Sequence, residues 1–349
     1  MRAVTAPGND SVAAKAAEWA RGHGLGFVVT GAEELAYRLH PPRTGGLPDP
    51  SLLHPSTPAH PVGAPSGSSS PSTSRMRPPL APLAGKALPG EGVFQAVVNV
   101  NGRPAVQLAY LRPDPVHTSY LTAVLVMDPA LLRFVQHPGY AEPGHRNLWS
   151  QPDAVRPGAR AGLAVTFNGG FKLQDAHGGY FADGHAVRAL RPGAASAVIT
   201  RNGRLTVGSW DHDVRMTPQV VSVRQNLKLL IVRGQVVPDV EANTQAVWGA
   251  TVKQADFVWR SGVGITARGD VVYAVGAALS ARSLAQVLQR AGAVRAMQLD
   301  INTTWVSGMW YTHGTTADSA VPHKVLPFQR PADRYLSATS RDFFAVYAR

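Results

Sequence analysis

From about residue 92 onward, short apolar runs alternate with turn signals, and this pattern restricts the chain to a fold rich in antiparallel β-sheet. Asn-Gly, Arg-Gly or Gly-Asp dipeptides separate apolar runs in "VNVNGRPAV", "ITRNGRLTV", "IVRGQVV" and "ITARGDVVY". Such dipeptides readily adopt the backbone conformations of tight hairpin turns. The predicted strands lie within residues 93–100, 104–112, 120–128, 162–169, 196–203, 204–210, 226–234, 262–269 and 270–276.

One helix interrupts this pattern. Ser280 is the predicted N-cap of "ARSLAQVLQRAG", which carries one apolar stripe and ends at Gly292. The apolar strand "VRAMQL" follows and runs directly into a polar turn at Asp300. We predict an α+β fold with a largely antiparallel or mixed β-sheet core and flanking helices, in which a strand-to-turn edge carries the site.

Composition divides the chain into three parts. Residues 41–91 contain 13 of the 28 prolines and the run "SGSSSPSTS", which predicts a low-complexity, disordered linker. Residues 1–40 contain a predicted helix in "SVAAKAAEWA", a strand in "LGFVVT" and a second helix in "GAEELAYRL". This segment is too short for a core of its own. Residues 92–349 form the predicted catalytic domain.

The absence of cysteine excludes disulfide frameworks, thiolate nucleophiles, zinc ribbons and iron–sulfur centres. No apolar run approaches the roughly 20 residues of a membrane helix, so we expect no membrane span. The formal charge is 34 − 22 = +12, and arginine dominates the cations. Arginine suits anionic partners, but a biased genomic composition gives the same count. The arginines are scattered without a binding motif, which argues against nucleic acid.

Asp300 is the most suggestive single residue. It follows an apolar strand and precedes Asn302, Thr303, Thr304 and Trp305, so a carboxylate, an amide, hydroxyls and a ring lie within six residues. Such a cluster is typical of a binding or catalytic site. The alternative is that Asp300 only closes an Asx-turn after the strand.

A second cluster lies in the glycine-rich segment 167–184. Asn168, Asp175, His177 and Asp183 stand there among five glycines, including the pair Gly169–Gly170. Glycine allows close backbone approach to a ligand, and long loops of this kind often carry function. His177 is a candidate acid/base or an ordinary turn residue.

Two arginines stand in otherwise apolar strand contexts. Arg224 lies in "VSVRQNLKLL", beside Asn226, and Arg260 follows Trp259. A buried arginine needs an anionic or hydrogen-bonding partner, which is either a protein carboxylate or a substrate anion. The "DHD" run at 211–213 is a poor metal site, because adjacent strand residues point to opposite faces. We therefore expect no metal and no cofactor.

Four motifs occur in a characteristic order: "VTFNGGF", "GGYFADGHAV", "WRSGVGITARGDVVYAV" and the helix leading to "GAVRAMQLDINTTW". In this order they resemble the phosphodiester glycosidase family, in a branch from actinobacterial-type, high-GC bacteria. That family contains the uncovering enzyme, which removes N-acetylglucosamine from phosphodiester-masked mannose. The family motifs fall here on Asn168, Phe171, Arg260, Gly264, Leu299 and Asp300. This chain departs from the family at residues 301–304, where three glycines and a serine are replaced by "INTT".

The resemblance implies hydrolysis of a glycosyl 1-phosphodiester in a phosphorylated glycan or cell-envelope polymer. A phosphate monoester is a good leaving group, so one carboxylate can suffice. We expect Asp300 to act as nucleophile or base, Arg260 and Arg224 to neutralise phosphate, and His177 and Asn168 to assist. The expected substrate-binding residues also include Asn226, Asn302, Thr304, Gly169, Gly170, Asp175, Trp259 and Trp305.

Two alternatives remain open. An ordinary glycoside hydrolase or transglycosidase would need a second carboxylate beside Asp300, from Asp175, Asp183, Asp213 or Glu241. A non-catalytic glycan-binding module would explain the altered 301–304 loop. The resemblance implies an extracytoplasmic setting, although no signal peptide is visible in this sequence. The sequence gives no indication of oligomeric state.

Overall fold

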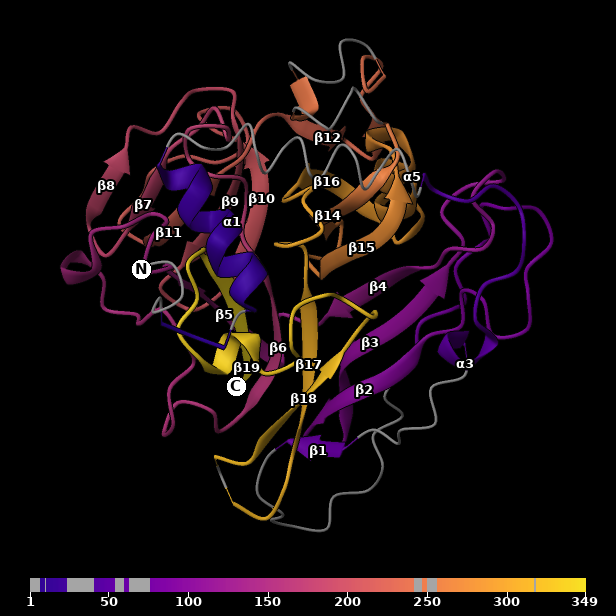
Figure 1. The fold of residues 1–349 in the computed structure, drawn as a ribbon, viewed down its shortest axis with the longest axis horizontal. Coiled ribbons are helices and arrows are strands. Elements are labelled where there is room, and N and C mark those ends of the chain that lie inside the picture. The colour runs from indigo at the N-terminus through magenta and orange to yellow at the C-terminus, as the bar shows by residue number, and fades with distance from the viewer. Residues whose placement is uncertain are drawn as a thin grey trace.

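The computed structural model describes residues 7–9, 11–23, 41–53, 60–62, 76–241, 247–249, 256–316 and 318–349. Its strands form three sheets (Figure 1). The large sheet has nine strands, in the order β1 (His60–Val62), β2 (Gln95–Val100), β3 (Arg103–Leu111), β4 (Thr122–Met127), β15 (Val271–Leu279), β14 (Val258–Thr266), β16 (Ala293–Gln298), β12 (Leu229–Val232) and β13 (Gln235–Val236). Only its β1–β2 pair is parallel.

The other two sheets have five strands each and are antiparallel throughout. The second sheet runs β18 (Ala320–Lys324), β17 (Gly308–His313), β6 (Leu163–Asn168), β19 (Phe343–Ala348), β5 (Leu132–His137). The third sheet runs β10 (Leu205–Ser209), β9 (Ala195–Thr200), β11 (Val220–Gln225), β7 (Tyr180–Ala182), β8 (His185–Arg188). The described helical segments are α1 (Val12–Gly22), α3 (Pro50–Leu53), α5 (Ala281–Arg290) and the short 3-10 turns Arg146–Leu148 and Arg334–Leu336.

The large sheet is buried on both faces near its centre, as the alternation along β15 shows. Val271, Tyr273 and Val275 point into the main core, which the second and third sheets also line. Val272 and Ala274 point to the other face, where the apolar stripe of α5 packs beside β14, β15 and β16 (Figure 1). Burial on both faces explains why this strand reads as a continuous apolar run.

The turn and capping signals of the sequence correspond to local geometry. Asn101 and Gly102, between β2 and β3, have φ of 50° and 71°, and Arg233 and Gly234, between β12 and β13, have 49° and 79°. Both pairs therefore adopt the positive φ of a type I′ hairpin turn. The Ser280 side chain accepts a hydrogen bond from the backbone of Ser283, which completes a capping box at α5.

The fold is mostly antiparallel β-sheet with few helices, which is compatible with the predicted α+β class. The sequence patterns missed the short or edge strands β1, β5, β7, β8 and β18, and also the inner strands β17 and β19. The predicted strand at 25–30 and helix at 31–39 lie outside the described residues. Part of the predicted linker, residues 76–91, contacts the domain: Arg77 pairs with Asp270 at 2.5 Å.

Candidate active site

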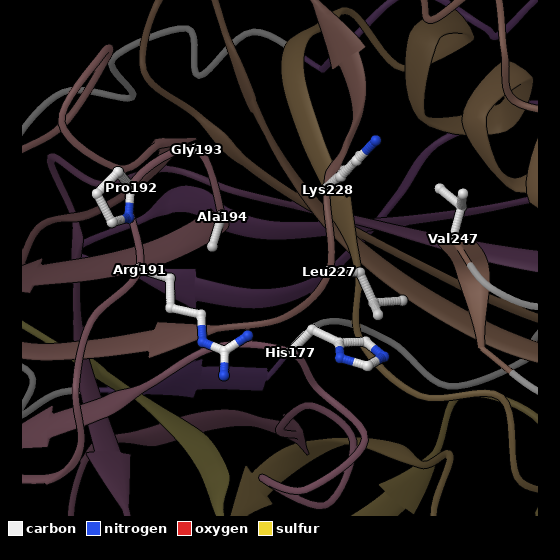
Figure 2. Close-up of a pocket in the computed structure, with 8 residues that line it drawn as sticks. All are labelled: His177, Arg191, Pro192, Gly193, Ala194, Leu227, Lys228 and Val247. Atoms are coloured by element: carbon white, nitrogen blue, oxygen red, sulfur yellow. The ribbon is translucent and has the colours of Figure 1, made fainter.

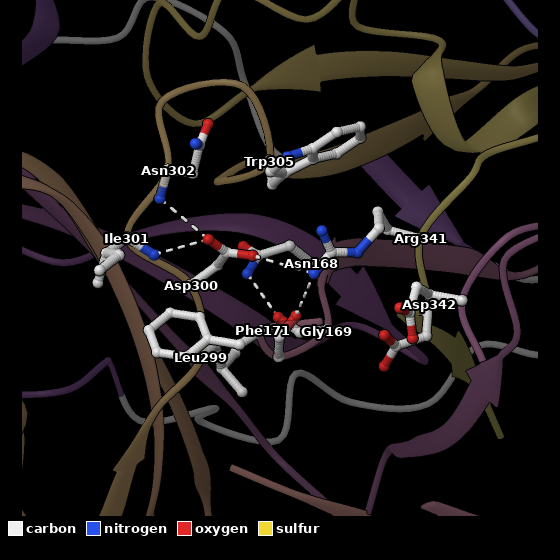
Figure 3. Close-up of polar contacts among 12 residues, drawn as sticks. Asn168, Gly169, Phe171, Leu299, Asp300, Ile301, Asn302, Trp305, Arg341 and Asp342 are labelled. Atoms are coloured by element: carbon white, nitrogen blue, oxygen red, sulfur yellow. Dashed lines mark hydrogen bonds and ion pairs between the residues drawn. The ribbon is translucent and has the colours of Figure 1, made fainter. Parts of the chain in front are cut away.

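Ends of four strands meet at one place in the fold. β6 ends at Asn168, β16 runs into Asp300, β14 contributes Ser261 near its start, and β19 begins just after Asp342. Direct pairing brings them together, because Asn168 is the register partner of Phe343. Ser261 donates its backbone N–H to the Asp300 carbonyl at 2.9 Å. Figure 3 shows Asp300, Arg341 and Trp305 close to one another at this junction.

The Asp300 carboxylate is buried, with 4% of the residue exposed, and each of its oxygens has a separate role. Oδ1 accepts hydrogen bonds from the backbone N–H of Ile301 at 2.7 Å and of Asn302 at 2.9 Å. Oδ2 lies 3.7 Å from Nη2 of Arg341. Asp300 thus closes an Asx-turn, and its other carboxylate oxygen faces a cation. Burial raises the pKa of Asp300, and Arg341 opposes that increase.

Three arginines surround the Trp305 ring beside this carboxylate. Their guanidinium carbons lie 4.5 Å (Arg330), 5.2 Å (Arg341) and 5.4 Å (Arg334) from the ring centroid. All three residues are buried. Cations within about 6 Å of an indole are attracted by its ring electrons, so Trp305 helps to hold positive charge at this site.

Two of these arginines retain hydrogen-bonding capacity. Arg341 donates from Nη2 to the Gly170 carbonyl at 3.2 Å, and Arg334 donates from Nη1 to the Trp305 carbonyl at 2.9 Å. Within the described part of the chain, the buried Nε of Arg341 and of Arg334 each have no hydrogen-bond partner. A buried guanidinium N–H without an acceptor is costly.

Asn168 is fully engaged by protein groups. Its Oδ1 accepts from the Tyr273 hydroxyl at 2.9 Å and from Ser307 N at 3.2 Å. Its Nδ2 donates to the Gly169 carbonyl at 2.8 Å and to Ser261 Oγ at 2.9 Å. Ser261 Oγ in turn accepts from the backbone N–H of Asp300 at 3.2 Å. The Asn168 amide therefore positions the strand ends under Asp300, and none of its hydrogen-bonding capacity is left for a substrate.

Arg224 is paired within the protein. Its Nε and Nη2 lie 2.9 and 3.2 Å from the two carboxylate oxygens of Asp342, and both residues are buried. Nη1 donates to the Gln225 carbonyl at 2.8 Å, and Nη2 also donates to the Phe171 carbonyl. This bidentate pair fixes the start of β19, which places the neighbouring Arg341 against Asp300.

The buried Arg224–Asp342 ion pair should contribute strongly to the free energy of unfolding. We expect Asp342→Asn to lower the free energy of unfolding by about 3–5 kcal/mol, because it leaves the Arg224 guanidinium buried without a counter-charge. Urea denaturation monitored by circular dichroism measures the change. The matched control is Glu241→Gln, which breaks the exposed pair with Arg282 and should cost less than about 1 kcal/mol. Equal losses in the two variants would contradict a structural role for the buried pair.

Steric crowding explains why positions 169 and 170 are both glycine. A Cβ atom on Gly169 would collide with the Asp342 carboxylate, and one on Gly170 would lie 2.9 Å from Asn226 Oδ1. Asn226 Oδ1 accepts from Phe171 N at 3.0 Å, and its Nδ2 donates to the Leu299 carbonyl at 3.0 Å. Asn226 therefore ties the glycine loop to the strand that leads into Asp300.

The Arg260 side chain forms its hydrogen bonds with residues of the large sheet and with Asp256, and not with the Asp300 carboxylate. It donates to the Leu279 carbonyl at 2.7 Å, to Gln298 Oε1 at 2.7 Å and to the Asp256 carbonyl at 3.1 Å. Burial lowers the pKa of Arg260 to about 10. Its guanidinium thus joins strands of the large sheet to one another. The neighbouring Trp259 packs against Phe328, with ring centroids 5.5 Å apart.

The remaining predicted residues divide into two groups. Asn302 and Thr304 lie in the turn after Asp300, where Asn302 Oδ1 accepts from Thr304 N at 2.8 Å. Figure 3 shows the Asn302 side chain directed away from the carboxylate. Asp175 and His177 are exposed on the glycine loop, and His177 lines a separate cavity (Figure 2).

The other carboxylates considered from sequence have partners of their own. Asp183 accepts from Ser150 N at 2.7 Å, Asp213 accepts from Ser209 N at 2.9 Å, and Glu241 pairs with Arg282. In the described ranges, no group of three or more His, Asp or Glu side chains is arranged to hold a metal ion. Over the same ranges, no helix has the length and apolar character needed to cross a membrane.

Sequence reasoning missed Arg330, Arg334, Arg341 and Asp342. The only local signal was the charged pair in "TSRDFF", which stands directly before an apolar run that becomes β19. The same kind of signal, a charge at the boundary of an apolar strand, marked Asp300.

The junction thus combines a buried carboxylate with buried arginines and an aromatic ring. Residues 161–320 match the model of the phosphodiester glycosidase family. This match confirms the resemblance to the family, while the actinobacterial-type branch stays a prediction. The matched residues include both Asn168 and Asp300. A search of the curated proteins finds no match to this chain.

Solved structures include similar chains. The catalytic domain of zebrafish N-acetylglucosamine-1-phosphodiester alpha-N-acetylglucosaminidase, auto-inhibited by its pro-peptide, is 17% identical, with a TM-score of 0.46 over 73% of this chain and 88% of that chain. A hypothetical protein from Synechocystis is 12% identical, with a TM-score of 0.37 over 72% of this chain and 63% of that chain.

Proposed function

We propose that this protein hydrolyses the anomeric C–O bond of a glycosyl 1-phosphodiester in a phosphorylated glycan or cell-envelope polymer. The observation that carries the proposal is the buried Asp300 carboxylate facing Arg341, with N–H groups of Arg341 and Arg334 left without protein acceptors. The match of residues 161–320 to the phosphodiester glycosidase family supports the same reaction class.

In this proposal the arginines hold the departing phosphate. The C–O bond breaks with its electron pair moving to the phosphate oxygen, so negative charge grows on a group that Arg341 and Arg334 contact. Charge-assisted bonds from a guanidinium suit phosphate geometry and strengthen as the charge develops. These two residues take the role that the sequence had assigned to Arg260 and Arg224, whose guanidinium nitrogens each already donate to a protein acceptor.

Asp300 acts at the sugar side of the same bond. Its ionised carboxylate either attacks the anomeric carbon or takes a proton from the water that does so. The Asx-turn holds Oδ1, so Oδ2, which faces Arg341, is the reacting oxygen. Trp305 is buried with its ring against the arginines, so it holds these cations in place rather than stacking on a sugar. Asn168 and Asn226 position the site.

The single-carboxylate arrangement favours a phosphodiester over an ordinary glycoside. An alcohol leaving group needs a second carboxyl group as general acid, whereas a phosphate monoester has a second pKa of about 6 and leaves readily. Of the four candidate second carboxylates, Asp183, Asp213 and Glu241 each have protein partners, and Asp175 is exposed on the glycine loop. The buried Asp342 at the same junction is paired with Arg224.

The proposal is tested by incubating the purified protein with a panel of sugar 1-phosphodiesters, including that of N-acetylglucosamine, and with neutral glycosides of the same sugars. We expect reducing sugar to be released from at least one phosphodiester at a rate well above that from its neutral counterpart. Binding of the panel without turnover would favour the glycan-binding module instead.

The pH dependence of activity provides a prediction about Arg341. The reaction needs ionised Asp300, whose pKa is raised by burial and lowered by Arg341. Activity should therefore fall as pH drops through this raised pKa. Arg341→Gln removes the opposing cation, so we expect the acid limb of kcat/KM to move to higher pH. Arg268→Gln changes an exposed residue in the turn between β14 and β15 and should leave the acid limb in place. An acid limb that does not move in Arg341→Gln would contradict the assigned contact.

A further inference from the structure

A cavity of about 440 Å³ lies between the glycine loop, the segment before β9 and the segment after β11. It is lined by His177, Arg191, Pro192, Gly193, Ala194, Leu227, Lys228 and Val247 (Figure 2). Its described lining contains three basic side chains and no carboxylate. Figure 2 shows the His177 ring beside Leu227 and the Arg191 guanidinium on the other side of the His177 backbone, while the Lys228 side chain extends away from both.

The Arg191 backbone is fixed while its charged group is available. Gln225 Oε1 accepts from Arg191 N at 2.8 Å, and Gln225 Nε2 donates to the Arg191 carbonyl at 3.1 Å. Among the described residues, no hydrogen bond or ion pair engages the Arg191 guanidinium. Arg191 therefore has a fixed backbone and a guanidinium without a protein acceptor, so it can bind an anion from solvent.

The cavity and Asp300 lie on two sides of one small apolar cluster. Leu227 lines the cavity and packs with Phe171 and Ala176, and Ile301, the residue after Asp300, packs against the same cluster. The intervening Asn226 is bonded to Phe171 N and to the Leu299 carbonyl. The cavity is therefore rigidly connected to the strand that presents Asp300.

Two residues of the cavity hold an uncommon backbone conformation. His177 and Leu227 have φ of 51° and 57°, in the left-handed region that non-glycine residues seldom adopt. The Leu227 backbone is held there by a bond from its N–H to the Ala176 carbonyl at 2.8 Å and by one to its own carbonyl from Ala195 N at 3.0 Å. Such conformations persist where the surrounding structure fixes them, often at binding sites.

We propose that this cavity is a second anion subsite, which binds the phosphate of a neighbouring unit when the substrate is a phosphoglycan with repeated phosphodiesters. Arg191 and His177 donate hydrogen bonds to this phosphate, and Lys228 adds charge at the margin. The apolar floor formed by Leu227 and Val247 accommodates the carbon skeleton of the glycan. The inference rests on the proposed function, and it specifies a polymeric substrate with at least two phosphates.

The test compares a methyl diester of N-acetylglucosamine 1-phosphate with a trimer of phosphodiester-linked N-acetylglucosamine 1-phosphate units. We expect wild-type kcat/KM to be about tenfold higher for the trimer, which is the gain of about 1.4 kcal/mol that one additional anion contact supplies. Arg191→Gln combined with Lys228→Gln should remove this preference. Arg268→Gln with Arg233→Gln removes the same charge elsewhere and should keep it. A preference that survives in the first variant overturns the inference.

A binding measurement separates this inference from the proposed function. In the Asp300→Asn background, calorimetric titration with the trimer should show affinity about tenfold weaker after the Arg191 and Lys228 substitutions, and a smaller dependence on salt. If wild-type protein cleaves neither probe but this loss of affinity is observed, the second subsite stands and the proposed hydrolysis fails. If the affinity is unchanged by the substitutions, the subsite is wrong whatever the hydrolysis result.

Discussion

Asp300→Asn is expected to lower kcat/KM on a cleavable sugar 1-phosphodiester by at least about a thousandfold while the fold is retained. The chemical loss follows because an amide is neither a nucleophile nor a base at the anomeric carbon. The fold is retained because the asparagine oxygen can still accept from the backbone N–H of Ile301 and Asn302. Reducing-sugar release measures the first effect, and thermal unfolding followed by circular dichroism measures the second.

Asp300→Ala serves as the structural control for this result. Alanine removes the acceptor of the Asx-turn as well as the charge, so we expect it to be as inactive as Asp300→Asn and less stable by about 1–3 kcal/mol. If Asp300→Asn kept full activity, Asp300 would not take part in the chemistry. If it unfolded like the alanine variant, the residue would have a mainly structural role.

Arg341→Gln is expected to produce the second largest loss. We predict a fall in kcat/KM of about a hundredfold or more on a phosphodiester and a much smaller fall on a nitrophenyl glycoside of the same sugar. The nitrophenyl group also leaves with little protonation but carries no phosphate for Arg341 to neutralise. Removal of one preorganised donor from an anion-stabilising site typically costs this much.

Arg260→Gln provides the comparison that separates phosphate binding from structural support. Arg260 donates to the Leu279 carbonyl and to Gln298, so its loss should lower stability and reduce activity on both substrates by similar factors. A phosphate-specific loss in Arg260→Gln, with little change in Arg341→Gln, would restore the assignment made from sequence alone.

Much of the fold was predictable because its signals are local. Hairpin turns at Asn101–Gly102 and Arg233–Gly234 need positive φ, and those residue types supply it within a few positions of each strand. The N-cap of α5 is likewise encoded by Ser280 and its near neighbours. Short edge strands such as β8 and β18 were missed, because their pairing depends on neighbouring strands rather than on an apolar run of their own.

The candidate site was only partly predictable, because residues far apart in the sequence, such as Asp300 and Arg341, meet there. Asp300 could be identified from its place directly after an apolar strand. Arg341 reaches it only because β19 pairs with β6, and that register is not visible in the sequence. Sequence reasoning anticipated that Arg224 would need a partner if buried, but it could not name Asp342, which lies 118 positions away.

The most direct test of the central claim is the position of bond cleavage. The wild-type protein is incubated with a sugar 1-phosphodiester in water enriched in oxygen-18, and the two products are separated and examined by mass spectrometry. Cleavage of the anomeric C–O bond predicts that the label enters the hydroxyl group at the anomeric carbon of the released sugar and is absent from the phosphate monoester. Label in the phosphate would show attack at phosphorus, which would contradict a glycosidase mechanism centred on Asp300.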